Sequence, residues 1–326
     1  MRRLVLLPAL RRLAPSPPQR RLVLSPALRR LLPSLALVTL MAGLTGCTGQ
    51  PAPARWVTPS PSPAGTVAPR LAQVAPLPPL PVPQAALDVS RQEVTYRREG
   101  RVLRTVLWVP STPSRVPAVV FSHGLNGTPE SFAPLLSAWA AAGFVVIAPA
   151  YPNTTRSAPR LDVYDVLNQP ADASFVLSQV LAGPLGKRID GDRLAAAGHS
   201  AGAITTVGLF TAGRDARLHA GIVLAGSGLG VGTAFTGTPA SLLFVHGDAD
   251  PLVSYASGKA TYDVVPWSKA MLTVPGGNHN DPYLQPSAPS FTAVRALTLA
   301  FLRLELYGDA SARQQLPRSP SFDDRL

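Results

Sequence analysis

The chain has 326 residues, enough for one large domain or two small ones, and 46% of them are apolar. Its net charge of +12 would suit a nucleic-acid partner, but eight arginines and no acidic residue lie in residues 1–46. Once those eight are subtracted, the rest of the chain carries only +4. Because residues 47–326 are only weakly basic, we do not expect the protein to bind nucleic acid.

The N-terminal segment predicts export. Arg29 and Arg30 precede an apolar run, 31–46, that ends at Cys47 in the string Leu-Thr-Gly-Cys. A basic start, a short apolar core and small residues before a cleavage site are typical of a signal peptide, and the run is too short for a transmembrane helix. The string resembles the bacterial lipobox, which implies that Cys47 becomes the lipidated first residue. A plain signal peptide or an unprocessed anchor is the alternative.

The resemblance to a lipobox implies an extracytoplasmic location, periplasmic or at the cell surface, with a lipid anchor in a bacterial membrane. Stable anchoring requires more than one acyl chain, which this processing supplies. The following segment, 47–87, is rich in proline and poor in charge, so it cannot bury enough surface to fold alone. It predicts a tether, with an ordered arm packed on the domain as the alternative.

From about Ala86 the chain alternates short apolar runs with helix-like segments. The runs 94–98 and 102–109 flank a turn and predict an antiparallel hairpin. Later runs, rich in Val, Ile and Leu, are typical of strands buried on both faces: 118–122, 144–148, 194–197, 220–225, 241–245 and 269–274. The helix-like segments are 129–142, 171–181, 201–212, 255–264 and 290–306. This alternation predicts an α/β fold with a mostly parallel sheet, in which ligands bind beyond the carboxyl ends of the strands.

The strand 194–197 leads into Gly-His-Ser-Ala-Gly, residues 198–202, and then into a helical stretch. A G-x-S-x-G string between a strand and a helix predicts a sharp turn that presents the serine hydroxyl. The start of the helix adds backbone N–H groups that favour negative charge. We therefore expect Ser200 to be a nucleophile, with an ordinary serine in a tight turn as the alternative.

Five strings carry a wider resemblance: VVFSHGLNG (119–127), GFVVIAPAYP (143–152), AAAGHSAGA (195–203), LLFVHGDADPLV (242–253) and GGNHND (276–281). Through them the chain resembles the α/β-hydrolase superfamily over roughly residues 94–306. Within it, the chain is most similar to dienelactone-hydrolase-like and platelet-activating-factor-acetylhydrolase-like esterases. The resemblance implies the α/β-hydrolase fold and a serine hydrolase that cleaves carboxylic esters through an acyl-enzyme intermediate.

The superfamily's chain order, Ser then Asp or Glu then His, is met by Ser200, Asp250 and His279. His279 follows the last strand in a glycine-rich loop and would accept the serine proton. Asp250 follows the strand 241–245 and would orient the histidine. Asp248 on the same turn is the competing acid, and Asp281 is more typical of a turn cap.

An oxyanion hole is expected from two backbone N–H groups. Ala201 follows the nucleophile directly, and Leu125 completes the H-G-x pattern of the superfamily at residues 123–125. Each such donor is worth about 2.7–4 kcal/mol of transition-state stabilisation.

The positions of the remaining histidines give no indication of a metal site. His123, His199 and His246 flank the expected site and are interpreted as loop-bonding residues, and His219 is expected at the surface. No His or Cys pair has the spacing of metal ligands, and no dinucleotide-binding G-x-G-x-x-G opens the first strand–helix unit. We therefore expect neither a metal nor another cofactor.

Only about fifteen residues separate the runs 220–225 and 241–245, too few for the cap domain often inserted there. An open site suits short acyl esters, or esters presented on a lipid or polymer surface. Tyr151, Phe235 and Trp267 are candidates to line the site, with ordinary core positions as the alternative.

The sequence therefore predicts four parts: a signal peptide, 1–46; a Pro-rich tether, 47–87; a catalytic domain, 88–310; and a disordered tail, 311–326. The expected partners are a small-molecule, lipid or polymer ester and, through the lipid anchor, a membrane. Two alternatives remain: a peptidase or thioesterase with the same triad, and a noncatalytic binding lipoprotein. The intact Ser, Asp and His argue against the second.

Overall fold

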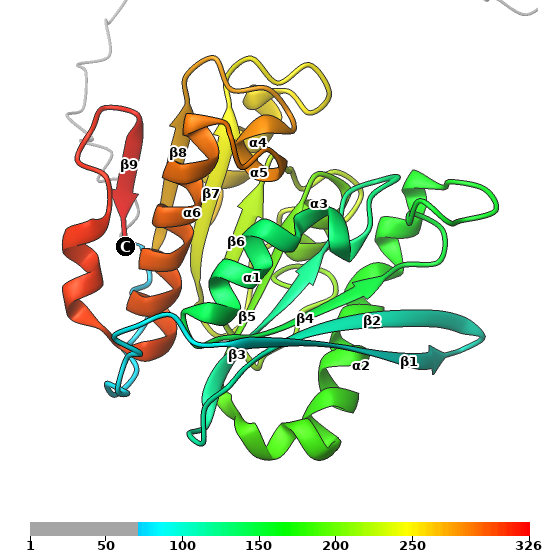
Figure 1. Ribbon diagram of the computed structural model, residues 1–326. Coiled ribbons are helices and arrows are strands. Elements are labelled where there is room, and N and C mark those ends of the chain that lie inside the picture. The colour runs from blue at the N-terminus through cyan, green and yellow to red at the C-terminus, as the bar shows by residue number, and fades with distance from the viewer. Residues whose placement is uncertain (1–70) are drawn as a thin grey trace, which may run out of the picture. The chain divides into compact units, whose positions relative to one another are not determined.

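The computed structural model describes residues 71–326, so the predictions for the signal peptide, for Cys47 and for most of the tether lie outside the described residues. Within 71–326 a single sheet has the strand order β1-β2-β4-β3-β5-β6-β7-β8-β9 (Figure 1). The strands are β1 Val89–Arg98, β2 Arg101–Pro110, β3 Val116–Ser122, β4 Val145–Ala150, β5 Ile189–His199, β6 Leu218–Leu224, β7 Ser241–Gly247, β8 Lys269–Val274 and β9 Phe322–Arg325.

The centre of the sheet is parallel and its edges are antiparallel. The six strands β4-β3-β5-β6-β7-β8 run parallel, while β1 and β2 at one edge and β9 at the other pair antiparallel. Every residue of β3, β4 and β7 is buried, as expected for continuous apolar runs covered on both faces. The predicted fold class is therefore confirmed, and all eight predicted strands are present.

Helices cover both faces of the sheet. They are α1 Ala133–Ala141, α2 Gln169–Ala182, α3 Ala201–Gly208, α4 Tyr255–Asp263, α5 Asp281–Leu284 and α6 Pro289–Leu302. Residues of α1, α5 and α6 belong to the core on one face, and residues of α2, α3 and α4 to the core on the other. Shorter helical turns are η2 Pro129–Phe132, η3 Val163–Leu167, η4 Pro184–Arg188 and η6 Ala310–Gln315, and the π-helix η5, Arg303–Tyr307, continues α6.

Residues 225–240, between β6 and β7, contain neither helix nor strand, so no cap domain covers the carboxyl edge of the sheet at this point. Among residues 71–326, no helix has the length and apolar character needed to span a bilayer.

The tether prediction is wrong for residues 71–87, which form an ordered arm against the domain. Ala72 pairs with Trp267, Leu80 N–H donates to Tyr307 O at 2.8 Å, and Leu87 N–H donates to Ala141 O at 2.8 Å. Proline-rich backbone has few N–H groups to satisfy, so an extended segment of it can lie on a domain with few hydrogen bonds. The folded domain therefore begins before residue 88.

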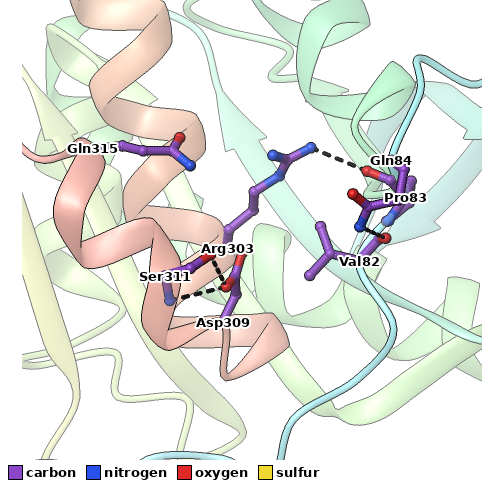
Figure 2. A pocket seen from close by; sticks show the side chains of 7 residues that line it. All are labelled: Val82, Pro83, Gln84, Arg303, Asp309, Ser311 and Gln315. Atoms are coloured by element: carbon purple, nitrogen blue, oxygen red, sulfur yellow. Dashed lines mark hydrogen bonds between the residues drawn. The ribbon is translucent and has the colours of Figure 1, made fainter.

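A polar cavity of about 280 Å³ lies between this arm and the C-terminal segment. Arg303 spans it and donates from Nη2 to Pro83 O at 3.4 Å (Figure 2). Figure 2 shows the residues that line the cavity: Val82, Pro83, Gln84, Arg303, Asp309, Ser311 and Gln315.

The prediction of a disordered tail over 311–326 is also wrong. The turn η6 overlaps its start, and β9 pairs antiparallel with β8, from Lys269 opposite Arg325 to Leu272 opposite Phe322. Leu316 and Phe322 are buried. Burial of these two apolar side chains in the core holds the tail in place, and the backbone of β9 covers the β8 edge of the sheet, which would otherwise be exposed.

Candidate active site

Ser200 lies in a sharp turn between the end of β5 and the start of α3. Its backbone angles, φ 56° and ψ −121°, fall in a region that non-glycine residues rarely adopt. A Cβ on Gly198 would lie 2.2 Å from Gly202 O, and a Cβ on Gly202 would lie 2.0 Å from Ser122 O. Both positions therefore require glycine, and the resulting turn presents the Ser200 hydroxyl at the carboxyl edge of the sheet.

The structure brings Ser200, His279 and Asp250 together in one hydrogen-bonded chain. His279 Nε2 lies 2.8 Å from Ser200 Oγ, and His279 Nδ1 lies 2.7 Å from Asp250 Oδ2. Because an ionised carboxylate only accepts, Nδ1–H donates to Asp250 and Nε2 is left to accept the hydroxyl proton of Ser200. Residues 79 and 29 positions apart thus meet with the protons arranged for transfer from serine to histidine.

Asp250 is fixed from its other side as well. Its Oδ1 accepts from Leu252 N–H at 2.8 Å and from Val253 N–H at 3.0 Å. Burial alone would raise the pKa of the Asp250 carboxyl, but the hydrogen bonds from His279 and these two N–H groups outweigh burial and lower it. The carboxylate therefore stays charged beside the imidazole.

The two competing acids, Asp248 and Asp281, form hydrogen bonds with residues other than His279. Asp248 is exposed and accepts from Gly276 N–H at 2.6 Å, while Asp281 is exposed and accepts from Asn278 Nδ2 at 2.7 Å. Asp281 is the first residue of the short helix α5, but its side chain does not cap the turn: Asn278 Oδ1 accepts from Asn280 N–H and from Asp281 N–H. Of the three acids that the sequence offers, only Asp250 contacts His279.

The loop that contains Leu125 lies against the serine turn, since a Cβ on Gly124 would be 3.2 Å from Ser200 Cβ. Neither Leu125 N–H nor Ala201 N–H donates a hydrogen bond to another of the residues 71–326. Asn126, with φ 58°, turns the loop, and its N–H donates to Thr154 O at 2.7 Å. Both N–H groups are thus available to a bound oxyanion.

A sheet of this order, with a serine turn after β5 and an acid and a histidine after β7 and β8, is the arrangement of the α/β-hydrolase fold. The sequence model of the chlorophyllase family, an esterase family of α/β-hydrolase type, matches residues 84–231. The chain has the α/β-hydrolase fold. The matched region covers just under half of the chain and includes Ser200 and the Leu125 loop, whereas Asp250 and His279 follow it. A search of curated proteins found no match.

Two neutral histidines support the loops of this site. His199 Nε2 donates to His279 O at 2.7 Å, and His123 bridges Gly124 O, at 2.8 Å from Nδ1, and Tyr151 N–H, at 3.2 Å from Nε2. Burial lowers the pKa of His199 to about 3 and that of His123 to about 4. Both rings are therefore uncharged near neutral pH.

The other two histidines lie away from Ser200 Oγ. His246 Nε2 donates to Val253 O at 2.9 Å and lies 3.4 Å from Asp250 Oδ2, so it supports the acid's turn. The predicted surface position of His219 is wrong: the residue is partly buried in β6, and its Nε2 has no partner among the described residues. Within residues 71–326, no three His, Cys, Asp or Glu side chains are grouped as metal ligands.

The three candidate wall aromatics are core residues. Tyr151 is fully buried and its hydroxyl lies 2.8 Å from Ser122 Oγ, while Phe235 packs edge-on against Trp267 with ring centroids 5.7 Å apart. All three therefore occupy ordinary core positions, which is the alternative to their lining the site.

A buried polar chain that the sequence does not reveal joins the Leu125 loop to the serine helix. Thr205 Oγ1 on α3 donates to Gln169 Oε1 at 2.6 Å, and Gln169 Nε2 donates to Thr154 Oγ1 at 2.8 Å. All three side chains are fully buried. Thr154 O also accepts the hydrogen bond from Asn126 N–H. These linked hydrogen bonds therefore fix the distance between the Leu125 N–H and the serine turn. No motif or spacing marks these residues.

Proposed function

We propose that this protein is a serine hydrolase that cleaves carboxylic esters through an acyl-enzyme intermediate. The hydrogen-bonded chain from Ser200 through His279 to Asp250, set in a strained turn at the carboxyl edge, is the observation that carries the proposal. The match to an esterase family supports the choice of ester chemistry. The five sequence strings favour a subgroup like the dienelactone and platelet-activating-factor esterases.

In the first half of the reaction, Ser200 Oγ attacks the ester carbonyl carbon while its proton passes to His279 Nε2. The carbonyl π electrons move to oxygen, and the backbone N–H groups of Leu125 and Ala201 donate to that oxyanion. When the intermediate collapses, the bond to the alcohol oxygen breaks, and His279 gives its proton to the leaving alcohol. Asp250 stabilises the imidazolium while it exists.

In the second half, water replaces the alcohol. His279 removes a proton from water, the hydroxide oxygen attacks the acyl carbon, and collapse of the second intermediate releases the acid and returns the proton to Ser200 Oγ. The same two N–H groups stabilise both oxyanions, each by about 2.7–4 kcal/mol.

Labelling by a fluorophosphonate tests the nucleophile. The purified chain should react, and Ser200→Ala should abolish the adduct, while Ser287→Ala, which removes an exposed serine, should leave labelling unchanged. His279→Ala should slow labelling strongly because the hydroxyl then lacks its base. An adduct that persists in Ser200→Ala would disprove the assignment, and no adduct on the natural chain would favour a noncatalytic binding protein.

A substrate panel tests the reaction class. It should contain p-nitrophenyl esters of increasing acyl length, a thioester, a peptide anilide, an insoluble polyester and, because of the matched family's name, chlorophyll. We expect the oxygen esters to be cleaved with the highest kcat/KM. Faster cleavage of the anilide or the thioester would favour the peptidase or thioesterase alternative.

We also propose that the enzyme is a lipoprotein held at the outer side of a bacterial membrane through Cys47. The lipobox-like string 44–47 after a basic and apolar segment supports this placement. Expression in a bacterium fed an alkyne fatty acid should yield a labelled protein in the membrane fraction. Cys47→Ser should remove the label, and a label retained in that variant would contradict the proposal.

A further inference from the structure

The large apolar side chains that remain exposed gather at one edge of the domain. Among residues 71–326 nine such side chains are exposed, and seven follow the carboxyl ends of parallel strands, with exposed fractions from 41% to 76%. These seven are Leu125, Leu161, Val163, Tyr164, Leu167, Leu229 and Leu252. Only Val102 and Val264 lie elsewhere, at the β1–β2 hairpin and at the end of α4. Single exposed apolar residues are ordinary, but a gathering at one edge signals a binding surface.

The densest part of this edge is the turn η3 and the residues before it. Tyr164 is 76% exposed, yet its neighbour Asp165 is buried and receives two hydrogen bonds from Arg101, both 2.7 Å long. The turn is therefore firmly anchored with its carboxylate inward and its apolar side chains outward. This arrangement is the reverse of what solvation alone would favour.

Leu229 extends the surface across the neighbouring loop. A Cβ on Gly230 would lie 3.2 Å from Leu167 Cδ2, so the loop after β6 touches η3. We call the set Leu161, Val163, Tyr164, Leu167 and Leu229 the apolar rim.

The apolar rim adjoins the Leu125 loop and the serine helix. Arg156 N–H donates to Gly127 O at 3.0 Å, which joins the start of this segment to the Leu125 loop, and η3 packs on α3, the helix that begins after Ser200. In Figure 1 the loops after β4 and β6 lie at the edge toward which the parallel strands point. A surface that covered the rim would therefore face Ser200.

The charge beside the apolar rim is positive. Arg156 and Arg160 are exposed, and neither guanidinium pairs with a carboxylate of the described residues. Residues 156–167 contain two acids: Asp165 is buried and paired with Arg101, and Asp162 caps η3, where it accepts from Tyr164 N–H at 2.9 Å. Exposed apolar side chains flanked by unpaired arginines complement an anionic lipid surface, with the former entering the headgroup region and the latter pairing with phosphates.

We propose that the apolar rim, with Arg156 and Arg160, docks this domain on an anionic lipid surface so that the Ser200 edge of the sheet faces the lipid. Docking is a binding event that needs no turnover, so it can be measured on an inactive chain and stands apart from the proposed esterase activity.

The test uses the full chain with Ser200→Ala and Cys47→Ser, the second change removing the only natural cysteine and any lipid anchor. In this background, Tyr164→Cys is labelled with an environment-sensitive fluorophore and titrated with vesicles of phosphatidylcholine, with or without phosphatidylglycerol. We expect a blue shift with the anionic vesicles only. The matched control Val264→Cys, at an exposed valine outside the rim, should show none.

The arginines are tested in the same labelled chain. Arg156→Ser with Arg160→Ser should raise the lipid concentration at half-maximal shift roughly tenfold or more. Arg295→Ser with Arg318→Ser, which changes the net charge equally at two exposed sites elsewhere, should leave it unchanged. No shift at residue 164, an equal shift at residue 264, or an equal response to purely zwitterionic vesicles would overturn the proposal.

Discussion

The side chain of His199 holds the backbone of His279: its Nε2 lies 2.7 Å from the His279 carbonyl oxygen. The two rings also lie against each other, with centroids 4.8 Å apart. Because a carbonyl only accepts, Nε2 carries the proton, and lowering the pKa of His199 to about 3 by burial keeps the ring neutral. The residue before the proposed nucleophile therefore positions the proposed base on a separate loop.

Two replacements of His199 distinguish the contribution of its hydrogen bond from that of its packing. His199→Gln keeps an N–H donor at nearly the same reach and should retain most of the esterase kcat. His199→Phe keeps the ring but loses the donor, so His279 should shift and kcat should fall roughly ten- to a hundredfold with KM little changed. Steady-state kinetics on a p-nitrophenyl ester measure both. Equal losses in the two variants would mean that only packing matters.

Acid should destabilise this protein at a higher pH than its carboxylates alone would cause. His199 and His123 titrate near 6.5 when unfolded, but their pKa values in the folded domain are about 3 and about 4. At pH values between the folded and the unfolded pKa of each histidine, the unfolded chain binds a proton that the folded chain does not. The free energy of unfolding therefore falls as the pH falls below about 6.5. Each histidine contributes a slope of at most about 1.4 kcal/mol per pH unit.

Urea unfolding at a series of pH values measures this slope. His199→Gln should unfold with a shallower dependence on pH between about 6 and 4.5. Glu130, whose pKa is lowered to about 2 chiefly by Arg104, loses its contribution only below its usual value of 4.5 and so leaves that window unaffected. Parallel curves for the variant and the natural chain would show that His199 does not drive the acid sensitivity.

The sequence predicts the parts of this molecule that depend on local pattern. The central strands are continuous apolar runs, and the turn at Ser200 is set by glycines two residues away on either side, so both can be read within a short window. Asp250 and Asp248 lie on one turn, and sequence spacing cannot decide between them. The choice follows from Leu252 and Val253 N–H groups, which bind one Asp250 oxygen and aim the other at His279.

Features that depend on distant partners are not predictable in this way. Gln169 binds Thr154, 15 residues away, and Thr205, 36 residues away, with no periodicity to mark the contacts. The arm 71–87 and the tail 311–326 have the composition of unfolded segments, yet each is ordered because the domain offers it an apolar surface and backbone partners. Composition describes a segment alone, whereas order here depends on what the segment contacts.

Adding one methyl group at Gly202 should disable the protein. A Cβ there would lie 2.0 Å from Ser122 O, a backbone atom of the central sheet that cannot move aside. Gly202→Ala should therefore lower the free energy of unfolding by at least about 1–3 kcal/mol and displace Ser200. Gly191→Ala, where a Cβ meets nothing within 4 Å, is the matched control and should unfold as the natural chain does. A folded, fully active Gly202→Ala protein would show that the turn tolerates a side chain.

The stability of the domain should depend on the arm 71–87. Arg193 is almost fully buried, and its Nη2 donates to Pro78 O while its Nη1 donates to Leu306 O at 2.8 Å. Without the arm, one end of this guanidinium and the Tyr307 carbonyl lose their partners, and the apolar surface under Leu80 becomes exposed. Each lost buried hydrogen bond costs about 1–3 kcal/mol.

Two truncated chains test the arm directly. A chain that begins at residue 71 should unfold in urea at the same midpoint as the longer chain, because it keeps every contact between the arm and the other described residues. A chain that begins at residue 88 should lose about 2 kcal/mol or more of its free energy of unfolding. Since Ser200, Asp250 and His279 lie on other elements, whatever remains folded should keep its kcat. Equal midpoints for the two truncations would mean that the arm lies on the domain without stabilising it.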